Sequence, residues 1–77
     1  MISRPRNMSR LRRAIGLAIR RERERRRLTL DQLAARCGCS RSTLQRWECA
    51  ATMRAIETVA RALRIPPTTL VPEERDR

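Results

Sequence analysis

The sequence predicts an all-α fold, a compact five-helix domain, and three observations support this prediction. Proline is absent from residues 6–65, so nothing breaks a helix in that stretch. Apolar residues recur at spacings of three and four, which places them on one face of a helix. Tyrosine and phenylalanine are absent, and the alternation of apolar and polar residues that is typical of strands is missing.

The first helix is expected over residues 10–26, with Ser9 as its N-cap. Its apolar face consists of residues at helical spacing, namely Leu11, Ala14, Ile15, Ala18 and Ile19. Residues 1–9 are polar and basic, and we expect them to form a flexible arm. The domain itself is then expected to occupy residues 10–71, and residues 72–77 are expected to form a disordered, charged tail.

Two short helices with a turn between them are expected next. The second helix starts at Thr29, because Thr29-Leu30-Asp31-Gln32 fits a capping box of reciprocal side-chain and backbone hydrogen bonds. Gly38 stands where a helix ends in a left-handed turn. Ser40 then caps a third helix that runs from residue 41 to about residue 48 or 49. Two short helices joined by a turn with a glycine are the helix-turn-helix arrangement, here formed by helices 2 and 3.

A fourth helix is expected to begin at its N-cap, Thr52. Its buried face is predicted to consist of Met53, Ile56, Val59, Ala60 and Leu63. Pro66 and Pro67 end this helix, and a last short helical turn is expected to carry Leu70 and Val71.

The charge of the chain points to a polyanionic partner. The formal net charge is +11, from 19 basic and 8 acidic residues, and every basic residue is arginine. Such a balance favours nucleic acid as the partner, and the planar arginine fork suits phosphates and guanine edges. The exclusive use of arginine also fits a GC-rich genome, so composition alone leaves this second explanation open.

Other classes of protein fit the sequence less well. A domain of 77 residues has little room for an enzyme pocket. The sequence also contains no histidine that could act as a base for a cysteine nucleophile, so we expect no enzyme. No apolar run is long enough for a transmembrane helix, and the N-terminus lacks a secretory signal. We therefore expect a cytoplasmic protein on the nucleoid, with no membrane partner and no evident small-molecule effector.

The cysteines do not predict a metal site. Cys37, Cys39 and Cys49 are odd in number and form no CxxC pair, and a zinc site with four ligands would need a carboxylate as well. We expect no metal and no cofactor. Cys37 and Cys39 are interpreted as small core residues.

In combination these elements resemble the phage repressor and Cro-like helix-turn-helix family, whose fold is the lambda-repressor-like domain. The resemblance covers about residues 11–71. The residues that carry it are Leu33, Ala34, Gly38, Ser40, Arg41, Ser42, Thr43, Leu44, Trp47, Glu48, Ile56, Val59, Ala60, Leu63, Ile65 and Leu70. It implies that the third helix lies in the major groove of double-stranded DNA.

The resemblance also implies the residues that contact DNA. Expected base contacts come from Arg41, Ser42, Gln45 and Arg46. Expected phosphate contacts come from Thr29, Ser40, Thr43, Arg20 and Arg23. Two arginines among the base contacts can each bind the N7 and O6 atoms of guanine, although contacts to phosphate alone remain the alternative.

Glu48 needs a partner, because an acidic residue beside DNA is repelled. The resemblance implies an ion pair between Glu48 and Arg23 that orients Arg23 toward a phosphate. Trp47, the single aromatic residue, is interpreted as structural rather than as a base-stacking residue. The sequence departs from the family at Leu30, where a polar residue is usual, and in a shortened loop after Glu48.

One such module makes too few base contacts to specify a single genomic site. The resemblance implies a homodimer on a palindromic operator, with its interface near Ile65, Leu70 and Val71. We expect a sequence-specific transcriptional regulator, a repressor of phage or mobile-element type. The alternatives are a sequence-independent nucleic-acid-binding protein and, less well supported, a protein that lies on a membrane surface through its arginine-rich first helix.

Overall fold

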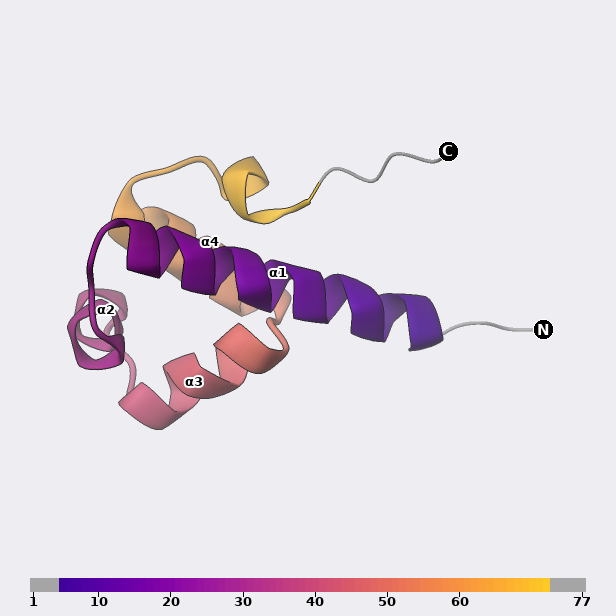
Figure 1. Cartoon of the computed structure of the whole chain (residues 1–77), viewed down its shortest axis with the longest axis horizontal. Helices are drawn as coiled ribbons and strands as arrows, with labels where there is room; N and C mark the ends of the chain where they lie inside the picture. The colour runs from indigo at the N-terminus through magenta and orange to yellow at the C-terminus, as the bar shows by residue number, and fades with distance from the viewer. Residues whose placement is uncertain (1–4, 73–77) are drawn as a thin grey trace.

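The computed structural model describes residues 5–72 of the chain, and this part is all-helical (Figure 1). Its elements are α1 (Pro5–Arg25), α2 (Leu30–Cys37), α3 (Arg41–Cys49), α4 (Met53–Leu63) and the 3₁₀ helix η1 (Pro67–Leu70). The all-α prediction is confirmed, but the expected fifth helix is a single 3₁₀ turn. Because Pro66 and Pro67 lack amide hydrogens, they cannot continue α4, and a separate turn starts at Pro67 and closes with the Thr69 amide donating to the Pro66 carbonyl at 2.9 Å.

Helix α1 is longer at its N-terminus than the expected residues 10–26. It begins at Pro5, a residue that suits the first helical position because its fixed φ is already helical. Ser9 therefore lies inside α1 and is not its N-cap. The arm was expected over residues 1–9. Residues 5–9 belong to α1, and residues 1–4 lie outside the described residues. Most of the expected tail, residues 73–77, also lies outside the described residues.

The core is formed by side chains from α1, α2, α3, α4 and η1; α1 packs on α3, and α2 packs on both α3 and α4 (Figure 1). Its buried apolar residues are Ile15, Ile19, Leu33, Ala34, Leu44, Ala51, Ala55, Ile56, Val59, Ala60, Leu63 and Leu70. Four residues of the predicted apolar faces are absent from it: Ala14 and Ala18 are half-buried, and Leu11 and Met53 are exposed. Met53 is 70% exposed because it stands in the first turn of α4, and Leu11 is 36% exposed because the N-terminal turns of α1 extend past the other helices (Figure 1).

Gly16 allows α1 to contact the backbone of α3. A Cβ atom at Gly16 would lie 2.5 Å from the Glu48 carbonyl oxygen and 2.7 Å from the Trp47 carbonyl oxygen. Just beyond this crossing, the Ala51 amide donates to the Arg12 carbonyl at 3.1 Å. The C-terminal end of α3 is therefore fixed on α1 by backbone contact and not only by side-chain packing.

The C-terminal segment packs on α4 and α1, and this removes Leu70 from the surface expected to form a dimer interface. Leu70 is fully buried, Ile65 is half-buried and Val71 is 41% exposed. Leu70 is thus a core residue, because η1 folds back so that its last side chain fills the space between α1 and α4. A charged substitution at Leu70 would test folding and not association, and Val71 is the accessible apolar residue of this segment.

None of the helices in residues 5–72 combines the length and apolar character that crossing a bilayer requires.

Candidate nucleic-acid interface

The start of α2 is held by the predicted capping box. The Gln32 amide donates to the Thr29 hydroxyl oxygen at 3.1 Å, and the Thr29 amide donates to the Gln32 side-chain oxygen at 2.8 Å. The neighbouring Leu30 is half-buried and packs against the core. A leucine at this position therefore contributes to packing, which explains how the fold tolerates the loss of the polar residue expected there.

The turn between α2 and α3 has the geometry that its glycine predicts. Gly38 adopts the left-handed conformation, with φ 72° and ψ 31°, and its amide donates to the carbonyl oxygens of Ala34 and Ala35. The Thr43 amide then donates to the Ser40 hydroxyl oxygen at 3.1 Å and caps α3. Both ends of the turn are therefore fixed, and α3 starts in a defined direction relative to α2.

The predicted base-contact residues share the solvent-exposed side of α3. Arg41, Ser42, Gln45 and Arg46 are all exposed, whereas Leu44 on the opposite side is fully buried. Two of the predicted phosphate contacts, Ser40 and Thr43, flank this face, and their hydroxyl groups are hydrogen-bonded at 3.0 Å. The geometry brings these residues together at one surface.

Arg23 and Glu48 form an ion pair between α1 and α3. The Arg23 Nε donates to Glu48 Oε2 at 2.7 Å and its Nη2 donates to Glu48 Oε1 at 3.3 Å. The Arg23 Nη1 also donates to the Leu28 carbonyl at 2.9 Å. The side chains of Arg23 and Glu48 are only 13% and 9% exposed. Arg23 therefore ties α1, the residues before α2, and α3 together, and this geometry does not favour the expected phosphate contact, because the guanidinium is engaged inside the protein.

Comparison with known families agrees with this arrangement. The family model described as a helix-turn-helix domain matches residues 14–77. The chain belongs to the helix-turn-helix domain family. No curated protein matches the chain significantly. In this helix-turn-helix domain, α2 and α3 form the motif. Helix-turn-helix domains bind DNA through the second helix of the motif, which is α3 here.

Besides Arg23, three arginines at or just after the C-terminal end of α1 pair with glutamates of that helix. Arg20 Nε lies 3.1 Å from Glu24 Oε2, and the two side chains are 56% and 53% exposed. Glu22 pairs with Arg25 at 3.5 Å and with Arg26. Exposed pairs of this kind are weak, so Arg20 can exchange Glu24 for a phosphate at small cost.

Trp47 and Gly16 show what the sequence did and did not reveal about this site. Trp47 is half-buried and packs against the core of the helix-turn-helix domain, as the structural interpretation requires. Gly16 holds the C-terminal end of α3, yet no role was predicted for it. The available signal was a single glycine inside a helical pattern, which often marks a close packing contact.

Two of the three thiols, Cys37 and Cys39, lie beside the turn at Gly38, and Cys49 is the last residue of α3. Cys37 and Cys39 are half-buried against the core, Cys49 is exposed, and residues 5–72 contain no group of three or more side chains suited to a metal ion. Burial, with a smaller contribution from the neighbouring Cys39 thiol, raises the pKa of Cys37 from 9.0 to about 11. The neutral thiol is therefore the favoured form of Cys37.

This shift predicts a difference in thiol reactivity. At about pH 8 the thiolate fraction of Cys37 should be about a hundredfold below that of a thiol with pKa 9.0, since the pKa is about 11. Alkylation of the folded protein should therefore modify Cys49 first, and the Cys37 rate should keep rising up to about pH 11. Peptide mass spectrometry after timed alkylation measures both rates. In urea, as a control, Cys37 and Cys49 should be alkylated at similar rates. Equal alkylation rates of the two residues in the folded protein would contradict the prediction.

Proposed function

We propose that this helix-turn-helix domain is a sequence-specific regulator of transcription that binds double-stranded DNA and acts as a repressor. The observation that supports this most directly is the exposed face of α3. Its four polar side chains lie on a helix whose start is capped by Ser40 and whose end is fixed by Gly16 and by the Arg23–Glu48 pair. A rigid helix with a polar outer face is what readout in the major groove requires.

The roles of individual residues follow from their chemistry. Arg41 and Arg46 are proposed to bind guanine N7 and O6, while Ser42 and Gln45 contact neighbouring base edges. Thr29, Ser40, Thr43 and Arg20 are proposed to contact phosphates. They lie at the N-terminal ends of α2 and α3 or on the exposed surface of α1.

The net charge of +11 supports DNA as the partner, but it favours a sequence-independent nucleic-acid-binding protein equally. The capped, fixed α3 favours sequence-specific binding, since a non-specific binder needs no defined helix direction. We propose that the protein acts on the nucleoid. The resemblance to phage repressors and Cro supports a regulator of phage or mobile-element type.

A homodimer on a palindromic operator completes the proposal. A module of this size contacts too few base pairs to select one genomic site, and two-fold symmetry doubles that number. With Leu70 in the core, Val71 and the half-buried Ile65 are the accessible apolar residues near the C-terminal end of the described chain.

Selection of bound duplexes from a random pool, at one stated salt concentration, tests the proposed function. The expected result is a palindromic consensus whose half-sites contain guanine and lie about one helical turn apart. A consensus without symmetry would contradict the dimer and leave sequence-specific binding in place. Recovery of the pool without enrichment would identify a sequence-independent nucleic-acid-binding protein instead.

Arg41→Ala should relax the preference at one position of the selected half-site. The loss of a bidentate contact is expected to cost about 1–3 kcal/mol for the preferred base and little for other bases. Affinity measured on the consensus and on single-base variants checks this. The matched control is Arg61→Ala, which removes the same charge from the exposed side of α4. A uniform loss across all duplexes would show that Arg41 contacts phosphate.

A further inference from the structure

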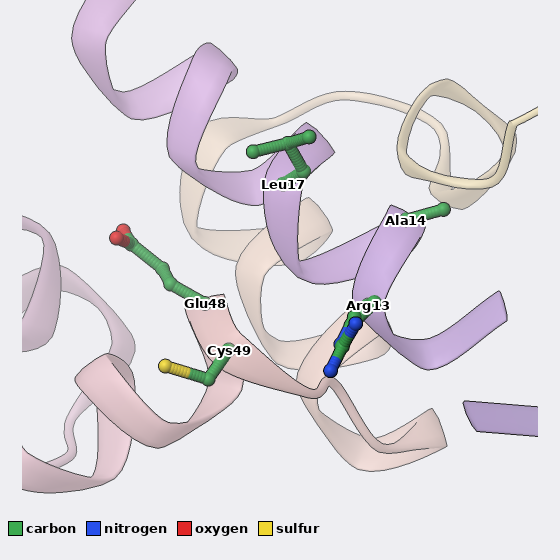
Figure 2. A pocket seen from close by; sticks show the side chains of 5 residues that line it. All are labelled: Arg13, Ala14, Leu17, Glu48 and Cys49. Carbon is green, nitrogen blue, oxygen red and sulfur yellow. The ribbon is translucent and has the colours of Figure 1, made fainter. Parts of the chain in front are cut away.

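A groove with an apolar floor lies beside the contact between α1 and the C-terminal end of α3 (Figure 2). It is lined by Arg13, Ala14, Leu17, Glu48 and Cys49. Leu17 is 45% exposed, although it is one of the large apolar residues of α1, and Cys49 is exposed on the opposite wall. Leu17 is not among the apolar residues that pack against the core, and the proposed DNA contacts do not use it.

Most of the charges around this groove are positive. The Glu48 carboxylate is neutralised by Arg23, and Figure 2 shows it turned away from Arg13 and Cys49. Arg13, Arg20 and Arg21 are exposed and lie three or four residues from Leu17, so they flank it on the helix surface. Within residues 9–72, Arg13 and Arg21 have no ion-pair partner, and Arg20 has only the exposed Glu24.

An apolar floor bordered by arginines fits a ligand with apolar and acidic groups together. A DNA phosphate would match the arginines but would leave the Leu17 side chain uncovered. At a two-fold contact through this groove, a second copy would place the same exposed arginines near one another. An acidic amphipathic helix supplies both groups, since an apolar residue can enter between Leu17 and Cys49 while carboxylates one turn away face the arginines.

We propose that this groove binds an acidic amphipathic helix of a partner protein, and that the bound helix excludes DNA. The second clause rests on the proposed function. Cys49 follows Gln45 and Arg46 by four and three residues on α3, so the groove adjoins the face proposed to read bases. A helix about 10 Å across, seated beside that face, would occupy the space that the duplex needs. An acidic partner would therefore release the regulator from its operator.

The test uses the full chain and two labelled helical peptides. Both carry the same glutamates; one has a leucine stripe, and the other has alanine at those positions. Binding is measured by fluorescence anisotropy to the wild type, to Leu17→Gln, and to Met53→Gln. Met53 is the matched control, because it is also an exposed apolar residue, 70% accessible, at the start of α4.

The wild type and Met53→Gln should bind the leucine peptide about tenfold more tightly than the alanine peptide, the effect of burying one large apolar side chain. Leu17→Gln should lose that tenfold difference and keep its affinity for duplex DNA. The leucine peptide should displace duplex DNA from the wild type and should displace it about tenfold less well from Leu17→Gln. Peptide binding with no DNA binding at all would contradict the proposed function but not the groove.

Several results would overturn the groove proposal. One is equal affinity for the two peptides, and another is an unchanged preference in Leu17→Gln. Loss of DNA binding in Leu17→Gln would make the groove part of the DNA interface. Self-association of the wild type that Leu17→Gln abolishes, measured by sedimentation, would assign the groove to a second copy. Peptide binding only after deletion of residues 73–77 would assign it to the end of this chain.

Discussion

Gly16→Ala is expected to lower the free energy of unfolding by about 3 kcal/mol. The added Cβ atom would lie 2.5 Å from the Glu48 carbonyl oxygen and 2.8 Å from the Glu48 carbonyl carbon. These are backbone atoms of α3, so no side-chain rotation can relieve the overlap, and α1 must move away from α3. Helix propensity alone would give the opposite sign, because alanine in a helix interior is favoured over glycine by about 1 kcal/mol.

Urea unfolding followed by circular dichroism measures this effect. Gly38→Ala is the matched control, since a Cβ atom there meets nothing within 4 Å and the change introduces only the strain of φ 72°. That strain should cost about 1 kcal/mol. If Gly16→Ala were as stable as the wild type, the close contact between α1 and α3 would be refuted.

Glu48→Ala is expected to destabilise the domain by about 3 kcal/mol, the lower end of what removal of one partner from a buried ion pair costs. The Arg23 side chain is only 13% exposed, so the substitution leaves its charge largely desolvated, with the part-buried Leu28 carbonyl and the Glu24 carboxylate, 4.0 Å away, as its remaining partners. The expected loss of unfolding free energy therefore reflects the cost of leaving Arg23 without its partner and not the net contribution of the ion pair to stability.

A double-mutant cycle with Arg23→Ala separates the coupling between the two side chains from their individual effects. The double variant should be less destabilised than the sum of the single variants. Glu24→Ala is the control, because its pair with Arg20 is more than half exposed and should be worth less than about 1 kcal/mol. Equal, small losses in Glu48→Ala and Glu24→Ala would show that the Arg23–Glu48 pair is solvated.

Because the Arg23–Glu48 pair and Gly16 act on the same end of α3, their substitution should also affect DNA binding indirectly. A displaced α3 would weaken binding to every duplex, whereas the loss of a base contact changes preference at one position. The two kinds of effect can therefore be distinguished in the same affinity measurements.

The sequence by itself determined the local structure of the motif. Thr29 with Gln32, Gly38, and Ser40 each satisfy or permit backbone conformations within a few residues, and such interactions do not depend on the rest of the fold. The same reasoning located the exposed face of α3, since Leu44 and the outward polar residues follow helical periodicity. The partner of Glu48 required the family resemblance, because it is 25 residues away along the chain.

The tertiary structure decided which apolar residues become buried and where backbones meet. Periodicity marked Leu11 and Met53 as buried, and Leu70 was expected at a dimer interface. Only Leu70 is buried, because burial depends on whether another element covers that position. It also decided that Gly16 faces the end of α3 and that Leu17 borders an open groove. Residues that are adjacent in α1 thus differ in role because packing between helices is set by the whole domain, whereas capping is set by a few neighbouring residues.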